Sequence, residues 1–156
     1  LFAVALLTGA VFAGAARADV PSPPGSGPDP SIADGSAAKA LAAARHRWHV
    51  RGYADYRFTI ARSCFCAPDS LGPLKITVRR RVPVDPPEAA YGLTTARSLF
   101  DLVAQGIANP DHVLQVTYDR RTGFPLRIQR DPIGLAVDDE ITVTMTAPAK
   151  LRPRRP

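Results

Sequence analysis

Two cysteines, Cys64 and Cys66, are the residues of this sequence best suited to covalent chemistry. In an exported protein two cysteines are expected to be oxidised, so we expect a disulfide between them. An extended chain holds the Cα atoms of residues i and i+2 near the upper end of the roughly 4.4–6.8 Å disulfide range, so the bond requires a bend. A small ring is readily reduced, so a thiol–disulfide exchange protein is an alternative. The pair lacks the Cys-x-x-Cys spacing at a helix N-terminus that usually serves that chemistry.

A group of carboxylates precedes the last apolar segment: Asp131, Asp138, Asp139 and Glu140. Calcium takes six to eight oxygen ligands, which makes a calcium-stabilised structural domain a second alternative. The spacing does not match an EF-hand, and adjacent residues of a strand point to opposite faces. We therefore favour a hairpin-end cluster that pairs with Arg127 or Arg130.

The remaining candidates for catalysis are isolated. His46 and His49 lie three residues apart in an expected helix, but flanking arginines oppose a metal cation, and a solvated helix end is the simpler interpretation. His112 stands alone near a strand start. Ser98 lacks a Gly-x-Ser-x-Gly elbow. These observations favour a protein without a catalytic site, and none of them implies a cofactor.

Basic residues alternate with threonines in the expected strands: Arg57, Lys75, Arg79 and Arg127. If the strands are in register, these cations share the solvated face of a sheet and can bind an anionic envelope component, such as a phosphate headgroup, or an envelope protein. Scattered surface charge that keeps a sheet soluble is the plain alternative. The formal net charge is +6, but five cations lie near the chain ends, and export separates the protein from nucleic acid.

Two amphipathic helices and five strands are expected to position these residues. The first helix spans residues 36–50 and the second begins after Thr94 or Thr95 and ends at Asn109-Pro110. Strands are expected at residues 56–61, 74–79, 114–119, 124–129 and 141–146, because apolar and polar residues alternate there. Prolines between residues 83 and 87 limit that segment to an edge strand or a loop. The sequence thus predicts an α+β fold, with an antiparallel sheet of about five strands covered on one face by two helices.

The ends of the chain differ in composition from its middle. Residues 1–18 combine an uncharged apolar run with Ala16-Arg17-Ala18, which is typical of a cleaved signal peptide. We expect a disordered linker at 19–35, a single domain at 36–147 and a basic Pro/Arg tail at 148–156. These features predict an extracytoplasmic protein, periplasmic or secreted, with no stable membrane span after cleavage.

Several landmarks together resemble a known family. They are Trp48, Tyr53, Tyr56-Arg57-Phe58, Cys64-Phe65-Cys66, the run Thr95 to Phe100, Val116 to Asp119, Gly123-Phe124-Pro125, Asp131 and Asp138-Asp139-Glu140. In this order they resemble the bacterial exported proteins grouped as domain-of-unknown-function family 6174. The resemblance spans Trp48 to Met145 and implies an exported α+β domain, with no established activity to transfer. Members tend to have a glycine turn after the second strand, where this chain has Arg79-Arg80-Arg81.

Overall fold

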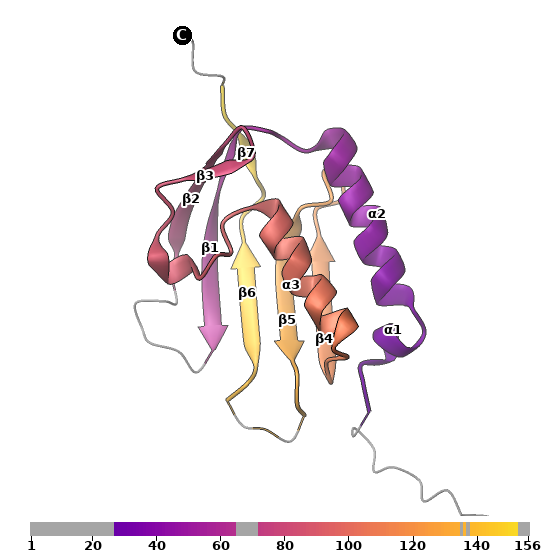
Figure 1. Cartoon of the computed structure of the whole chain (residues 1–156). Coiled ribbons are helices and arrows are strands. Elements are labelled where there is room, and N and C mark those ends of the chain that lie inside the picture. The colour runs from indigo at the N-terminus through magenta and orange to yellow at the C-terminus, as the bar shows by residue number, and fades with distance from the viewer. Residues whose placement is uncertain (1–26, 65–71, 135, 137, 153–156) are drawn as a thin grey trace, which may run out of the picture.

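The computed structural model describes residues 27–64, 72–134, 136 and 138–152. Its helices are α1 (Pro30–Ala33), α2 (Ser36–Arg51), the 3-10 helix η2 (Glu88–Ala90) and α3 (Ala96–Ala108). Its strands are β1 (Tyr56–Cys64), β2 (Leu74–Arg79), β3 (Val82–Val84), β4 (Val113–Tyr118), β5 (Pro125–Asp131), β6 (Ile141–Met145) and β7 (Ala149–Lys150). Figure 1 shows these elements in one sheet-and-helix body.

The strands of the described residues form a single seven-stranded sheet in the order β3-β2-β1-β6-β5-β4, with β7 paired to β1. Every pairing is antiparallel, so the predicted α+β class with an antiparallel sheet is confirmed. The predicted number of five strands is too low. β3 forms at the sheet edge despite Pro83, because an edge strand tolerates a residue without an N–H group. β7 lies in the segment predicted to be a tail.

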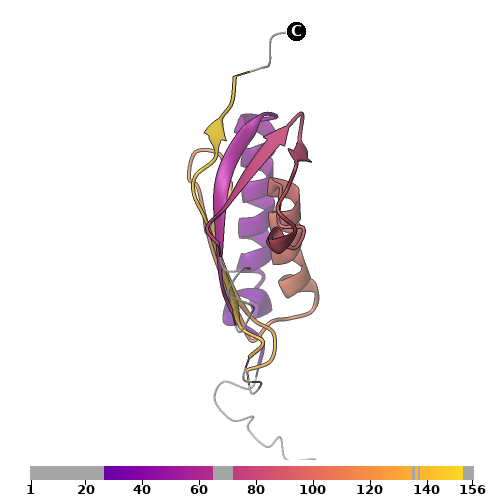
Figure 2. The same cartoon turned by 90° about the vertical axis from the view of Figure 1, so that its left-hand side faces the viewer.

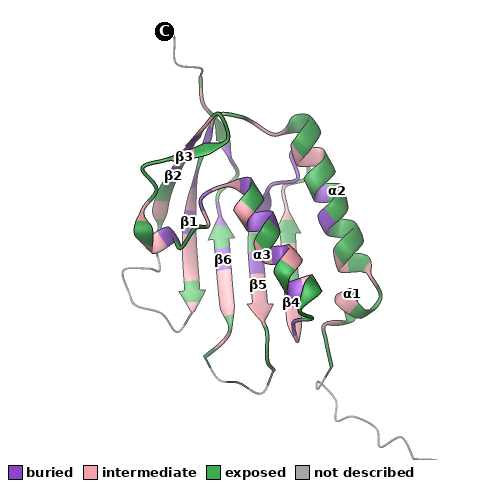
Figure 3. Ribbon diagram, viewed as in Figure 1, coloured by how far each residue is buried: buried purple, intermediate pink, exposed green. Residues whose placement is uncertain are grey.

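Helices α2 and α3 lie on the same side of the sheet, and the core fills the space between (Figures 1 and 2). The buried residues concentrate on the sheet-facing side of α3 and along the central strands (Figure 3). Aromatic rings join the layers: Trp48 of α2 meets Tyr56 of β1 edge-on at 5.3 Å between ring centroids, and meets Phe124 at 5.3 Å.

The helix ends follow from local chemistry. Thr95 caps α3 and forms a capping box with Ser98. The Thr95 hydroxyl accepts the Ser98 backbone N–H, and the Ser98 hydroxyl accepts the Thr95 backbone N–H. α2 ends at Arg51, one residue beyond the predicted end, and Gly52 is its C-cap. A Cβ at Gly52 would collide with the Trp48 ring, so only glycine lets the chain turn beneath that ring.

The alternation of inward and outward side chains along each strand, here called strand parity, determines which residues form the core. Phe58, Ile128 and Val143, all predicted to point inward, are buried, and Val116 packs against them partly buried. One inward position departs from the apolar pattern. Arg62 pairs with the buried Val143 in the β1–β6 register, and its guanidinium lies 4.6 Å from the centre of the Tyr91 ring.

Part of the predicted linker takes a defined structure. α1 follows Asp29, whose carboxylate accepts hydrogen bonds from the Ser31 N–H and from the Leu114 N–H of edge strand β4. Residues 29–34, in the segment predicted to be a linker, thus form a short capped helix beside β4. The predicted signal peptide, the rest of the linker and residues 153–156 lie outside the described residues. Within the described ranges, no helix has the length and apolar character needed to cross a membrane.

Candidate anion-binding site

Three cations lie side by side on the face of the sheet that is turned away from the helices. Arg57 on β1 is opposite Thr77 on β2, and residues two positions apart on a strand share a face. Lys75 and Arg79 are therefore the two diagonal neighbours of Arg57, at the roughly 7–8 Å typical of such positions. We call Arg57, Lys75 and Arg79 the basic cluster.

Within the described ranges of the chain, no carboxylate pairs with the basic cluster. The ion pairs found among the described residues join other side chains, and the one hydrogen bond from a cluster side chain runs from Arg79 Nη1 to the Arg152 carbonyl oxygen, at 2.7 Å. Arg57 and Lys75 are exposed, whereas Arg79 is half-buried. Three like charges this close repel one another, and a bound anion would relieve that repulsion.

Arg127, the fourth predicted cation, lies apart from the cluster. It is exposed on β5 and faces Thr144 of β6, so β6 separates it from β1. Its Nη2 donates to Gln129 Oε1 at 3.1 Å. The predicted set of four thus divides into a cluster of three and an outlying arginine on the same face.

Hydroxyl groups surround the cations on this face. Thr59 lies opposite Lys75 in the register, and its hydroxyl donates to the Thr146 hydroxyl oxygen, at 3.3 Å between the two oxygens. The Thr146 hydroxyl also accepts the Thr59 backbone N–H at 3.0 Å. Figure 2 shows α2 and α3 on one side of the sheet and, within the described part of the chain, no helix on the other. This face therefore offers an open polar surface with excess positive charge.

The predicted acidic group occupies the opposite end of the sheet from the β2–β3 turn (Figure 1). Asp131, Asp138 and Glu140 line a cavity of about 750 Å³ near the β5–β6 connection. Among the residues that the structure describes, no three His, Cys, Asp or Glu side chains are placed to hold a metal ion. Both carboxylate oxygens of Asp139 are buried from solvent, and neither has a hydrogen-bond partner among the described residues. The calcium site stays a prediction.

The expected pairing of this acidic group with arginine is wrong. Arg127 bonds to Gln129, and Arg130 bonds to Asp111, a residue that sequence reasoning did not single out. Arg130 lies on the inner face, since it pairs with the buried Leu114. The pattern around Asp111, a lone carboxylate after a helix-ending Asn-Pro, carries no signal of its distant partner.

The other predicted residues fall in separate places. Cys64 is the last residue of β1 and faces Ile141, while Cys66 lies outside the described residues, so their disulfide stays a prediction. His46 is exposed on α2, and His112 Nδ1 contacts the Gly27 carbonyl at 2.9 Å. Ser98 serves the cap of α3.

Comparison with known proteins places the chain in a family. The model of a family of unknown function, DUF6174, matches residues 40–148, which contain all the described strands except β7 and about three-quarters of α2. No curated protein and no solved structure matches the chain. With its match over more than half of the 156 residues, the chain belongs to the family of unknown function DUF6174.

Proposed function

We propose that this protein is a non-catalytic binding module of the cell envelope, and that it binds an anionic headgroup surface through Arg57, Lys75 and Arg79. The observation that carries the proposal is the basic cluster itself. Three neighbouring cations on a helix-free face have no carboxylate partner among the described residues. Arg127 extends the positive surface on the same side.

The expected strength follows from simple electrostatics. A basic residue near an anionic membrane surface contributes about 1 kcal/mol, so three together contribute about a hundredfold in affinity. The interaction is between exposed groups, and salt screens such charges over about 10 Å at 0.1 M. Binding should therefore weaken strongly as the salt concentration rises.

Co-sedimentation with vesicles tests the proposal. We expect the protein from residue 19 onward to bind vesicles with one-third phosphatidylglycerol and not pure phosphatidylcholine vesicles. Arg57→Glu should weaken this binding at least tenfold. Lys39→Glu, which changes the charge equally on an exposed position of α2, should have a much smaller effect. If both variants lose the same amount of vesicle binding, the effect depends on net charge alone, and the assignment of binding to this face of the sheet is wrong.

An extracytoplasmic location is part of the proposal. It is supported by the uncharged apolar run and the Ala16-Arg17-Ala18 pattern in residues 1–18. Fusion of the chain to a reporter enzyme that folds only after export provides the test. Activity that is lost when residues 1–18 are deleted is the expected result, and activity that is indifferent to the deletion contradicts the location.

A further inference from the structure

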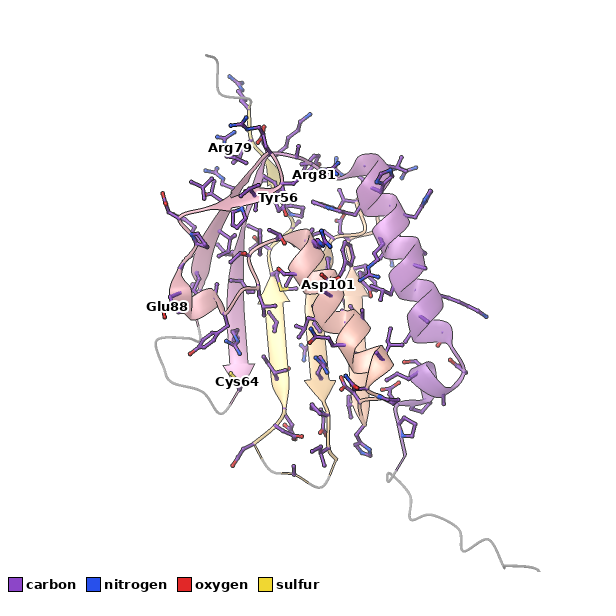
Figure 4. All side chains as sticks on the ribbon, in the orientation of Figure 1. Tyr56, Cys64, Arg79, Arg81, Glu88 and Asp101 are labelled. Carbon is purple, nitrogen blue, oxygen red and sulfur yellow. The ribbon has the colours of Figure 1, made fainter. Side chains whose placement is uncertain are left out.

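A groove opens on the helix side of the sheet, at the end where β2 turns into β3 (Figure 2). It has a volume of about 560 Å³ and lies between the second half of α2, the start of α3 and the β2–β3 turn. Figure 4 shows Tyr56 and Arg81 at this end of the molecule, with Asp101 further along α3. Ligand-binding clefts usually measure about 300–1,000 Å³, so the groove is large enough for a small molecule.

Aromatic rings line the apolar part of the groove. Trp48 lines it from α2 and Tyr53 from the loop that follows. Tyr56 lines it from β1 and Phe100 from α3. Trp48 lies edge-on to Tyr53, with 6.3 Å between the ring centroids. Trp48 and Tyr53 are partly exposed, so their rings provide a surface on which a flat apolar group can stack.

The charged part of the groove is positive. Three arginines line it against one aspartate, and Asp101 is already engaged: Arg45 Nη2 lies 3.0 Å from its Oδ1 and Arg97 Nε lies 3.8 Å from its Oδ2. Arg81 has no ion pair and no side-chain hydrogen bond among the described residues. His49 adds a further basic group at the rim. One arginine therefore remains to receive an external anion.

Arg81 is held in a backbone conformation that favours glycine. Arg79 pairs with Val82, so Arg80 and Arg81 form a two-residue hairpin turn, with φ of 48° and 67°. Positive φ at both positions defines a type I′ turn, which prefers Asn-Gly. For other residues this conformation costs about 1–2 kcal/mol each. The Arg81 N–H donates to the Ala54 carbonyl at 2.9 Å, which helps hold the turn.

A tyrosine hydroxyl lines the same groove as Arg81. Tyr56 is 2% exposed, lines the groove and accepts the Ala96 backbone N–H at its hydroxyl oxygen, at 2.9 Å. Burial raises the pKa of Tyr56, while the Ala96 N–H and the charge of Arg81 act to lower it. The hydroxyl thus keeps its proton at neutral pH, and no acceptor for that proton is found among the described residues.

We infer that this groove binds a small ligand with one anionic group on a flat apolar body, the anion at Arg81 and Tyr56 and the body against Trp48. This site is separate from the outer face of the sheet and goes beyond the proposed function. A strained arginine at the rim of a positive, aromatic groove is the juxtaposition that supports it, because residues in such backbone conformations cluster at ligand-binding and active sites.

The single tryptophan of the chain gives a direct readout, since Trp48 lines the groove. We would titrate the protein with phenyl phosphate, phenylacetate and inorganic phosphate, following Trp48 emission and the heat of binding. Phenyl phosphate or phenylacetate is expected to bind at least tenfold more tightly than inorganic phosphate. Comparing the first two probes identifies the preferred anion. If none of the probes changes the emission or releases heat at 10 mM, the inference is wrong.

Two glycine variants separate the ligand role from a structural one. Arg81→Gly should raise the melting temperature, because it removes the strain, and should weaken probe binding at least tenfold. Arg80→Gly relieves the same turn but its side chain does not line the groove, so it should raise the melting temperature and leave binding unchanged. Unchanged probe binding in Arg81→Gly, or equal losses in both variants, overturns the assignment.

Discussion

Arg130 on the inner face of β5 holds the carboxylate of Asp111 with two hydrogen bonds, Nε to Oδ2 at 2.6 Å and Nη2 to Oδ1 at 2.9 Å. The aspartate side chain is 1% exposed and the arginine side chain 12% exposed. The pair joins the loop after α3 to the sheet, at the end remote from the groove. Bidentate geometry of this kind is the strongest form of side-chain ion pair.

Removing one partner of this ion pair should lower the stability of the fold. We expect Asp111→Ala to lower the free energy of unfolding by about 3–5 kcal/mol, because it leaves the Arg130 charge buried without a partner. Replacing both residues, as Asp111→Leu with Arg130→Met, should cost less than the single change. Urea denaturation measures both. A single variant as stable as the parent would show that the pair does not form in solution.

Gly106 of α3 should resist replacement by alanine. Alanine normally stabilises a helix interior by about 1 kcal/mol relative to glycine. At this position a Cβ would collide with the Asp111 carboxylate and the Arg130 guanidinium, so Gly106→Ala should instead destabilise the protein. Gln105→Ala, at the exposed neighbouring position, should change the melting temperature little. A higher melting temperature for Gly106→Ala would contradict the close packing.

The protein should lose stability at alkaline pH through Tyr118. Burial raises the pKa of Tyr118 from 10.0 to about 12, against the opposing charges of Arg45 and Arg47. The folded state therefore keeps a proton that the unfolded state releases, and this contribution is present below pH 10 and is lost as the pH rises through 12. Allowing for solvent screening, we expect a loss on the order of 1 kcal/mol at pH 11.

Tyr118→Phe isolates this contribution. Denaturation curves of the variant and the parent should differ in their pH dependence between about pH 9.5 and 11.5, with the variant losing less stability. Identical pH profiles would mean that the Tyr118 hydroxyl titrates normally.

Asp29 should stabilise the fold above acid pH. Its partial burial raises the pKa of the carboxyl, but hydrogen bonds from Leu114 and Ser31 outweigh this effect, so the pKa is lowered from 3.8. The stabilisation is therefore present above pH 3.8 and is lost as the pH falls through the lower folded-state pKa. Asp29→Ala should cost about 1–3 kcal/mol at pH 7, since the Leu114 N–H loses its partner.

Asp29→Asn serves as the matched control for this position. It keeps an acceptor for the Leu114 N–H without the titrating charge, so it should retain part of the stability and flatten its dependence on pH between 3 and 5. An unchanged acid profile in Asp29→Asn would assign the acid sensitivity to other carboxylates.

The predicted bond between Cys64 and Cys66 leads to a redox measurement. A structural disulfide should have a reduction potential below about −300 mV, whereas an exchange-active pair should lie well above that value. Equilibration with glutathione and dithiothreitol buffers, followed by thiol counting, distinguishes them. A higher potential would favour the thiol–disulfide exchange protein over the binding module.

Much of the frame could be predicted because its signals are local. Period-two alternation is enough to direct Phe58, Ile128 and Val143 inward, and Thr95 carries the cap of α3 within four residues. The same parity placed Arg57, Lys75, Arg79 and Arg127 on one face, as the registers show. Short segments escaped prediction, since β7 has two residues and α1 has four, too few for any period to be visible.

What the sequence by itself determined is the parity of each strand and the stripe of each helix, because both depend on the fixed geometry of a few consecutive residues. Strand order, and with it every contact between distant segments, was decided only by the tertiary structure. The Arg130–Asp111 pair spans 19 residues, and the groove joins Trp48, Arg81 and Phe100 from three separate elements. Such neighbours leave no local pattern, since the chain brings them together only when its layers pack.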